Sequence, residues 1–438
     1  MKSFIKRFAI EGLFGTLNVR IDFDENVKII VGENGCGKTT ILNIVYYTLC
    51  NNDTEFLKLK YYDFQNIIIV FGDGVEVRFC KKDIIAWESV RLPLEIRRLY
   101  RFLSPEKVQK IIDDIQENRN IKETQNILEK YSINVVRFKK YVDDISEQEK
   151  MKNSMQATRK IIREKVPGKV LYLPTFRRIE DDLKSLDVTD SYTKKLSAEI
   201  GINFGMKDVE NLLGKTIKKI QESYRNGFSK IFTEIMFDFY NNKEMKNVSL
   251  QDTEAIITII NRMDDTLIVS EEKEKIINKI RQYVQTDLEN QEYNYFLNKL
   301  LFVFEEQMKT ESVLHQFAQK CNHYLINKEV IIDKNTLELS ICEKKGMHRK
   351  IELEKLSSGE KQIVALFAKL FLDDENNYIV LFDEPEISLS IRWQQTYLED
   401  IYSMEKCKFL LAVTHSPFVF DNNLDQYAVS IASYIEEK

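Results

Sequence analysis

Residues 32–39 read Gly-Glu-Asn-Gly-Cys-Gly-Lys-Thr and fit the pattern G-x-x-x-x-G-K-[ST]. An apolar strand is expected before this segment, at 27–31, and an amphipathic helix after it, from Lys38 to about Cys50. In such an arrangement, backbone N–H groups and the positive end of the helix dipole face an anion. A glycine-rich turn without function would not explain the Lys-Thr pair at its end. The segment therefore predicts an α/β fold in which a buried strand ends in a phosphate-binding loop.

The loop and the first turn of the helix supply the expected contacts with nucleotide. Lys38 is expected to reach the β and γ oxygens of ATP, and Thr39 offers a hydroxyl to Mg²⁺. ATP and Mg²⁺ are therefore the expected cofactors. The expected nucleotide-binding residues are Asn34, Gly35, Cys36, Gly37, Lys38, Thr39 and Thr40.

A second strand ends in two carboxylates. Residues 378–382 form a continuous apolar run before Asp383 and Glu384, which is typical of a buried parallel strand that delivers charge to a site. Asp383 is expected to hold Mg²⁺ through water, and Glu384 to orient or deprotonate the attacking water. By itself, an acidic pair after a strand is more often a solvated strand end. The glycine-rich loop in the same chain favours the catalytic interpretation.

Two further segments complete the set. Residues 356–362, Leu-Ser-Ser-Gly-Glu-Lys-Gln, open an amphipathic helix with a serine at the cap and Glu360 in the first turn. Residues 410–414 form another apolar strand, which ends at His415. Helix capping explains most of the first segment, and an isolated histidine at a strand end is more often structural. The order of the four segments is more specific than any one of them.

In that order the four segments resemble the ATP-binding cassette (ABC) family of ATPases. The resemblance implies that two copies associate head to head, and that Ser358 and Gly359 of one copy contact the γ-phosphate bound by the other. It also implies that His415 acts as a switch histidine beside that phosphate. Ser390 stands where the family more often has an acidic residue. The signature segment is Ser357, Ser358, Gly359 and Glu360, and the dimer-contacting loop is Ser388, Leu389 and Ser390.

The glutamine that the family places at the entry to its helical lobe is missing. Residues 174–178 read Pro-Thr-Phe-Arg-Arg at that point. Arg177 or Arg178 is expected to sense the γ-phosphate instead, and a solvated basic pair that caps the next helix is an equal alternative. Gln65 is a weaker candidate for the missing glutamine.

The chain is expected to form an interleaved ABC-type head with a large compact helical insertion. The head combines a mixed sheet with an antiparallel β subdomain, since residues 3–31 and the hairpin pattern at 66–79 favour strands. A helix is expected to open at Ser104, with Pro105 in its first turn. Breaks at 241–242 and 264–265 predict several short helices rather than a very long coiled coil. The expected segments are 1–83 (first part of the head), 84–166 (helical insertion), 167–183 (strand and arginine-rich segment), 184–325 (helical lobe) and 326–438 (second part of the head).

The amino-acid composition indicates which partners and which cellular compartment to expect. The 438 residues include 64 basic and 69 acidic side chains and carry a net charge of -5, so no global positive field draws the protein to nucleic acid. DNA binding is therefore not indicated by charge and would have to be local. Six cysteines lack CxxC pairs, which fits a reducing cytoplasm. No uncharged stretch approaches the roughly 18 residues that a membrane span needs. A cytoplasmic protein without membrane contact is expected.

Within the ABC superfamily, the large helical insert argues against a transporter subunit, and the single cassette against the duplicated translation factors. The remaining group includes Rad50, RecF and the overcoming-lysogenization-defect (OLD) nucleases. Residues 174–178, 204–209 and 393–418 look like segments of ATPases from bacterial anti-phage systems. The ATPase subunit of the PARIS system is the nearest resemblance, with Septu-type and retron-associated ATPases as near alternatives.

The resemblance implies a sensor ATPase with partners. The chain ends at Lys438, soon after His415, which leaves no room for the fused Toprim nuclease of the OLD proteins. A separately encoded effector of the Toprim or HNH nuclease kind is therefore expected, together with a phage-encoded trigger. The alternative is a Rad50- or RecF-like ATPase that acts on DNA directly, and the acidic balance favours the sensor. A third class, a scaffold unable to hydrolyse ATP, is disfavoured by Glu384.

Overall fold

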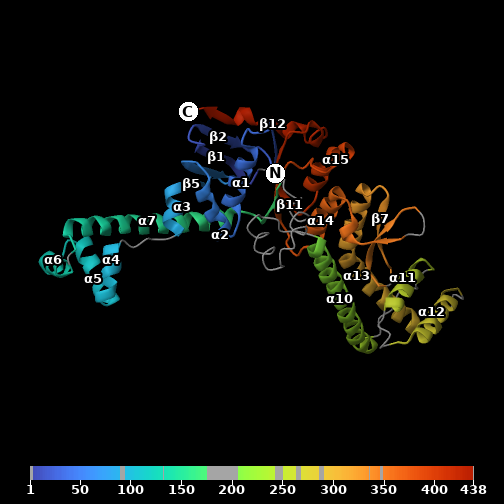
Figure 1. Ribbon diagram of the computed structural model, residues 1–438. Coiled ribbons are helices and arrows are strands. Elements are labelled where there is room, and N and C mark those ends of the chain that lie inside the picture. The colour runs from blue at the N-terminus through green and yellow to red at the C-terminus, as the bar shows by residue number, and fades with distance from the viewer. Residues whose placement is uncertain are drawn as a thin grey trace. The chain divides into compact units, whose positions relative to one another are not determined.

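The computed structural model describes residues 3–88, 94–131, 133–174, 206–241, 250–262, 268–285, 291–334, 336–345 and 349–437 (Figure 1). By its internal contacts the chain divides into two compact units. The first comprises Met1–Phe176, Glu375–Ile387 and Gln394–Lys438, and the second comprises Arg177–Asp374 and Ser388–Trp393. Within the described ranges, no helix combines the length and the apolar composition needed to cross a membrane.

The first unit contains two five-stranded sheets. One is antiparallel, in the order β13-β2-β1-β4-β5, and the other is parallel, in the order β12-β3-β11-β10-β6. The strands are β1 (Ile5–Leu13), β2 (Leu17–Asp22), β3 (Val27–Val31), β4 (Asn66–Phe71), β5 (Glu76–Cys80), β6 (Lys169–Leu173), β10 (Tyr378–Asp383), β11 (Cys407–Thr414), β12 (Ala428–Ser430) and β13 (Ile435–Glu437). This architecture confirms the predicted α/β head with an antiparallel β subdomain.

The parallel sheet brings distant parts of the sequence to one edge. All six residues of β10 are buried, as expected for the continuous apolar run that forms this strand. Thr414 of β11 pairs with Val31 of β3, and Asp383 of β10 pairs with Val413 of β11. Because parallel strands end at the same edge of a sheet, the segments that follow β3, β10 and β11 meet there.

Helix α1 (Lys38–Leu49) follows β3 and packs in a core that both sheets share. Its buried side chains include Ile41, Leu42 and Val45, at the spacing of one helical face. The same cluster contains Ile69 of the antiparallel sheet and Leu411 of the parallel sheet. The position of α1 is therefore fixed by contacts with both sheets.

The remaining helices of the first unit include an arm built on α7. Phe138 of α7 packs in a small core with α4 to α6, and Ile162 of the same helix packs in the core of the sheets. Ser104 and Pro105 stand at the expected start of α5, although the Ser104 hydroxyl makes no capping hydrogen bond. Because Pro105 has no N–H, the first turn has one donor fewer to satisfy. The helices are α2 (Asp53–Phe56), α3 (Lys81–Glu88), α4 (Leu94–Phe102), α5 (Pro105–Gln116), α6 (Ile121–Lys130), α7 (Val135–Lys165) and most of α15 (Ile391–Tyr402), with 3₁₀ helices η1 (Leu57–Tyr61), η3 (Pro417–Val419), η4 (Asp425–Tyr427) and η5 (Ile431–Tyr434).

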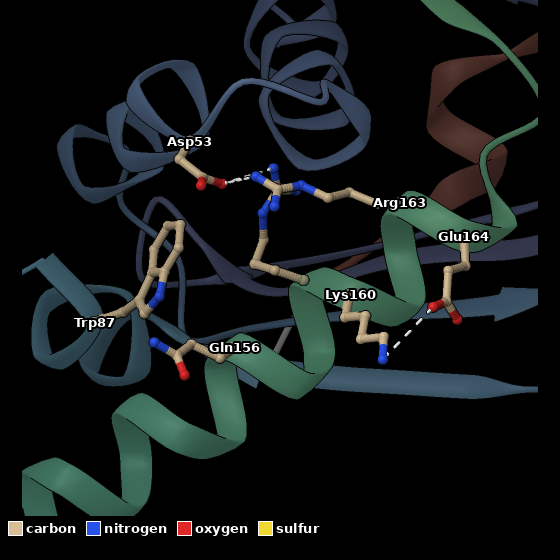
Figure 2. A pocket seen from close by; sticks show the side chains of 7 residues that line it. Asp53, Trp87, Gln156, Lys160, Arg163 and Glu164 are labelled. Atoms are coloured by element: carbon tan, nitrogen blue, oxygen red, sulfur yellow. Dashed lines mark hydrogen bonds and ion pairs between the residues drawn. The ribbon is translucent and has the colours of Figure 1, made fainter.

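Two arginines of α7 bind the end of α1 and the segment that follows it. The Arg159 guanidinium donates to the carbonyls of Thr48 (3.2 Å) and Cys50 (2.9 Å). Arg159 and Arg163 also donate to the carboxylate of Asp53 (Figure 2). The last carbonyls of a helix have no partners within that helix, so Arg159 supplies them from α7. The two arginines lie at a surface cavity of about 400 Å³ whose other lining residues are Asp53, Trp87, Gln156, Lys160 and Glu164.

The second unit is mainly helical and carries a small antiparallel sheet. The expectation of several short helices is wrong for α10 and α13, which have 36 and 34 residues. Neither helix contains proline, so its hydrogen-bond ladder has no obligatory break. Helix α10 ends at the first expected break, and the second, at 264–265, lies outside the described residues. The elements are α10 (Met206–Asn241), α11 (Leu250–Arg262), α12 (Ser270–Gln285), α13 (Gln291–Tyr324), η2 (Leu353–Lys355) and α14 (Ser358–Leu372), with strands β7 (Lys328–Ile332), β8 (Leu339–Glu343) and β9 (Lys350–Ile351).

Candidate functional site

The glycine-rich loop leaves β3 and turns directly into α1. Gly35 and Gly37 have φ angles of 86° and 80°, in the region that glycine reaches without strain, and Gly37 occupies the cap position of α1. The amino group of Lys38 donates to the carbonyls of Gly32 and Glu33, both at 2.7 Å. The loop therefore presents the amino end of α1 and a lysine amino group at one place, as an anion site requires.

The first turn of α1 meets the end of β10. The Thr39 hydroxyl donates to Oδ1 of Asp383 at 3.1 Å, although the two residues are far apart in the sequence. Asp383 is buried, and its strand neighbours hold it at the edge of the parallel sheet. The structure thus brings together the two residues that the sequence assigns to a metal ion.

Glu384 follows Asp383 in an unusual backbone conformation. Its φ of 48° is positive, and its backbone N–H donates to the carbonyl of Val413 at 2.9 Å. Non-glycine residues in this region store strain, and such residues are frequent at functional sites. Burial raises the pKa of Glu384, and the negative charges of Asp383 and Glu386 raise it further. The carboxylate is therefore a stronger base than an ordinary glutamate side chain.

His415 is held by a residue that the sequence analysis did not single out. Oε1 of Glu386 accepts from the backbone N–H of His415 at 3.1 Å and lies 3.0 Å from Nδ1 of its ring. Glu384 is farther away, with 3.9 Å between Oε1 and Nδ1. The Glu386 side chain is 6% exposed and that of His415 is 47% exposed. Glu386 thus orients the ring from the protein interior, on the side of Nδ1.

The signature segment lies in the second unit, at the amino end of α14. Ser357 caps the helix: its hydroxyl accepts from the Glu360 N–H at 3.3 Å, and its own N–H donates to the Glu360 carboxylate at 2.8 Å. This is the predicted capping box. Ser357 and Ser358 are exposed, whereas Gly359 is buried against the loop at 388–390. A Cβ at Gly359 would lie 2.3 Å from the carbonyl oxygen of Ser388, so only glycine fits there.

The sequence as a whole matches a known family. A model described as an AAA ATPase domain matches residues 4–420. The chain belongs to this AAA ATPase domain family. It is therefore an ATPase of the nucleotide-binding P-loop class, and its fold is that of an ABC-type ATPase head.

Individual relatives of this AAA ATPase domain protein are distant. A retron Vc95 probable ATPase from Vibrio cholerae serotype O1 biovar El Tor is 25% identical over 420 residues, which are 90% of this chain and 67% of the relative. Among solved structures, an Smc head domain from Pyrococcus furiosus, bound to the C-terminal domain of ScpA, has a TM-score of 0.34 at 14% identity. It covers 95% of this chain and 91% of the other. The Smc head of Pyrococcus yayanosii has a TM-score of 0.30 at 15% identity, with 95% and 93% coverage.

In this AAA ATPase domain protein, an aromatic side chain that the sequence analysis did not mention lies against the P-loop. Phe14, in the turn between β1 and β2, is 49% exposed and has a positive φ of 54°. A Cβ at Gly37 would lie 3.2 Å from the Phe14 ring. An exposed ring at the rim of a phosphate loop offers a face on which a nucleotide base can stack.

The remaining predicted residues are Gln65, the arginine pair at 177–178, the signature segment and the loop at 388–390. Gln65 packs beside Gly12: a Cβ added at Gly12 would lie 2.6 Å from Cγ of Gln65. Arg177 and Arg178 lie outside the described residues. The structure groups the loop, Asp383, Glu384 and His415 in the first unit, and the signature with Ser388, Leu389 and Ser390 in the second.

Proposed function

We propose that this protein binds ATP with Mg²⁺ and hydrolyses it at a site that two copies share. The contact of Thr39 with Asp383 carries the proposal, because it joins a hydroxyl and a carboxylate oxygen beside the P-loop. Mg²⁺ binds oxygen donors and is usually held by one or two protein groups together with substrate phosphates. Within the described ranges, no set of three or more His, Cys, Asp or Glu side chains could hold a metal. The donor pair Thr39 and Asp383 fits Mg²⁺ bound with ATP.

Each residue around the loop has a task in this proposal. Lys38 and the N–H groups at the start of α1 bind the phosphates, since both carry positive charge. Bound Mg²⁺ would neutralise charge on the β- and γ-phosphates. Glu384 orients the attacking water and accepts its proton, a role that its raised pKa favours. The His415 ring, which Glu386 orients, is partly exposed and donates a hydrogen bond to the γ-phosphate.

A second copy is proposed to supply the signature segment. Ser357 and Ser358 are exposed at the amino end of a capped helix, where N–H groups and the helix dipole favour an anion. The likeness of the motif order to ABC ATPases supports the assignment of this helix end to the γ-phosphate of the partner. ATP then has a higher affinity for the associated state than for the separate copies, and its hydrolysis allows the two copies to separate.

We infer further that the ATPase regulates an anti-phage system. The sequence match to a retron probable ATPase supports this role, since retron-associated ATPases were among the near alternatives expected from the sequence. In the proposal a separately encoded effector, of the Toprim or HNH nuclease kind, is restrained until a phage-encoded trigger shifts the protein between its open and closed states. A PARIS-type partner is one candidate for this effector.

Measurements of nucleotide affinity and phosphate release test the enzymatic proposal. Lys38→Ala should abolish ATP binding because it removes the phosphate contact, whereas Glu384→Gln should bind ATP and fail to hydrolyse it. Cys36 is an exposed thiol in the loop, so ATP should also protect it from alkylation. Equal ATP affinity in wild type and Lys38→Ala would contradict the assignment of the loop.

Phage challenge tests the biological role. Cells that carry the complete operon should lose protection with Lys38→Ala and with Glu384→Gln, because one variant cannot close and the other cannot reopen. Undiminished protection in both, or full protection by this chain without its neighbouring genes, would contradict the proposed role. Stimulation of hydrolysis by DNA in the absence of any partner would favour the Rad50-like alternative.

A further inference from the structure

A lysine outside the signature segment binds its glutamate. Nζ of Lys328, the first residue of β7, lies 2.8 Å from each carboxylate oxygen of Glu360. The Lys328 side chain is 23% exposed and that of Glu360 is 10% exposed, so the pair is largely shielded from solvent. A two-oxygen contact in such a place fixes both the position and the charge of the carboxylate.

Contacts on both sides of Lys328 hold the start of β7 in place. The side-chain amide of Asn322 donates to the Val330 carbonyl at 2.9 Å, and the Val330 N–H donates to Oδ1 of Asn322 at 2.6 Å. The Lys344 N–H donates to the Asn327 carbonyl at 3.0 Å. A lysine on a strand secured in this way presents its charge at a defined place.

Glu360 has two opposite effects on the amino end of α14. Its carboxylate accepts from the N–H and the hydroxyl of Ser357, at 2.8 and 2.9 Å, which stabilises the cap. Burial raises the pKa of Glu360, but hydrogen bonds from Lys328 and Ser357 outweigh burial and hold the pKa below its ordinary value. The group therefore carries a full negative charge at neutral pH. Uncompensated, this charge would repel any phosphate that approaches the same helix end.

We propose that Lys328 is a positioning residue for the shared ATP site: it neutralises Glu360 and holds it against Ser357, so that the exposed end of α14 can receive the γ-phosphate bound by a second copy. This inference rests on the proposed function and adds a residue that the motif order does not contain. Glu360 caps the helix, and Lys328 prevents that cap from repelling the incoming anion.

Removal of the two charges, first of Lys328 alone and then of both residues, provides the test. Lys328→Met should raise the ATP concentration needed for half-maximal self-association by about 5-fold, because it leaves the Glu360 charge uncompensated. Glu360→Gln in the same chain should restore association, since glutamine can also complete a capping box. The matched control is Lys350→Met, which removes a lysine of the same small sheet from an exposed pair with Glu338. That control should associate as wild type does.

Self-association is measured by sedimentation in a Glu384→Gln background, in which ATP is not consumed. ATP affinity of the separate subunits, measured at low protein concentration, should be the same with and without Lys328→Met, because each P-loop is intact. The association defect should shrink at high salt, as a charge effect does and a packing defect does not.

The outcomes separate this inference from the proposed function. If the Glu384→Gln protein does not associate with ATP at all, the shared site is refuted, and the role of Lys328 with it. If it associates and Lys328→Met has no effect, only the role of Lys328 is refuted. A defect that Glu360→Gln fails to restore, in a variant whose thermal unfolding matches wild type, would also overturn it.

Discussion

Three acidic side chains follow the apolar run of β10, and each has different surroundings. Asp383 accepts from the Thr39 hydroxyl, Glu384 has a strained backbone and a raised pKa, and Glu386 is buried against His415. Charges this close would repel one another unless each had its own partner. The surroundings therefore suit one carboxylate to a metal ion, one to water and one to the histidine.

Glu386→Gln is expected to lower the turnover of ATP by about tenfold while leaving ATP affinity nearly unchanged. Oε1 of Glu386 lies 3.0 Å from Nδ1 of His415 and so orients the ring, whereas a glutamine lacks the charge that stabilises this arrangement. Rates are measured for Glu386→Gln, His415→Ala and the double variant. If Glu386 acts through His415, the double variant should be no slower than His415→Ala. If the double variant instead slows turnover by the product of the two single effects, Glu386 acts independently of His415.

Phe14→Ala is expected to weaken ATP binding by about tenfold, because stacking of a base on an aromatic ring contributes roughly 1–3 kcal/mol. Binding of inorganic tripolyphosphate, which has no base, should not change. Phe102→Ala is the matched control, since Phe102 is also an exposed ring and lies on the arm. An equal loss of affinity for ATP and tripolyphosphate would mean that Phe14 supports the loop rather than the base.

The sequence could indicate Lys38, Thr39 and Asp383 because each belongs to a short local pattern with a known chemical use. Phe14 and Glu386 are different, since no local pattern assigns either residue a task at the site. Phe14 becomes relevant only because the turn after β1 folds over Gly37, and Glu386 because β11 ends beside it. The acid after Pro385 was a visible signal, but its partner could not be known before the strands were paired.

Helix α1 extends from the P-loop to the arm. Its amino end carries Lys38 and Thr39, and the carbonyls at its carboxyl end accept from Arg159 of α7. The helix is packed in the core that the two sheets share, which holds both of its ends in place. The residues between the two ends do no chemistry, but they fix the distance between the loop and α7.

Arg159→Leu is expected to reduce the free energy of unfolding by about 3 kcal/mol. The change removes a buried cation that satisfies carbonyls of Thr48 and Cys50, and leucine offers them no donor. The comparison is with Lys160→Leu, whose ion pair with Glu164 is exposed and 4.0 Å long. That control should change stability by less than about 0.5 kcal/mol. Denaturant unfolding followed by circular dichroism measures both, and equal effects would contradict the proposed role of Arg159.

Element types followed from periodicity more reliably than element lengths did. The strands β3, β10 and β11 are mainly apolar, and the hairpin of β4 and β5 surrounds a glycine-rich turn, so the sequence indicated all five strands. It did not indicate the lengths of α10 and α13, because the end of a helix without proline depends on side-chain packing that the local sequence does not show.

The first unit is assembled from three separate stretches of the chain. Strands β3, β6, β10 and β11 lie side by side in one sheet although the long helices of the second unit intervene in the sequence. Long-range pairing of this kind depends on side-chain packing over the whole sheet, which the local sequence does not show. The five segments expected from the sequence therefore stay a prediction. The same division places Ser358 and Lys38 in different units. Whether the signature at each ATP site comes from the same copy or from the partner copy is therefore a question for experiment.

Mixing of two inactive variants tests the shared site in the whole molecule. Lys38→Ala lacks a working P-loop but has an intact signature, whereas Ser358→Arg has an intact P-loop and a blocked signature. A mixed dimer contains one site with both intact halves, so an equal mixture should recover about a quarter of wild-type hydrolysis, because half of the dimers are mixed and half of their sites are complete. A chain with both changes, mixed with Lys38→Ala, provides no complete site and should stay inactive. Subunit exchange is verified by pull-down of differently tagged chains. If exchange occurs and no hydrolysis returns, each copy completes its own site and the proposed head-to-head arrangement is wrong.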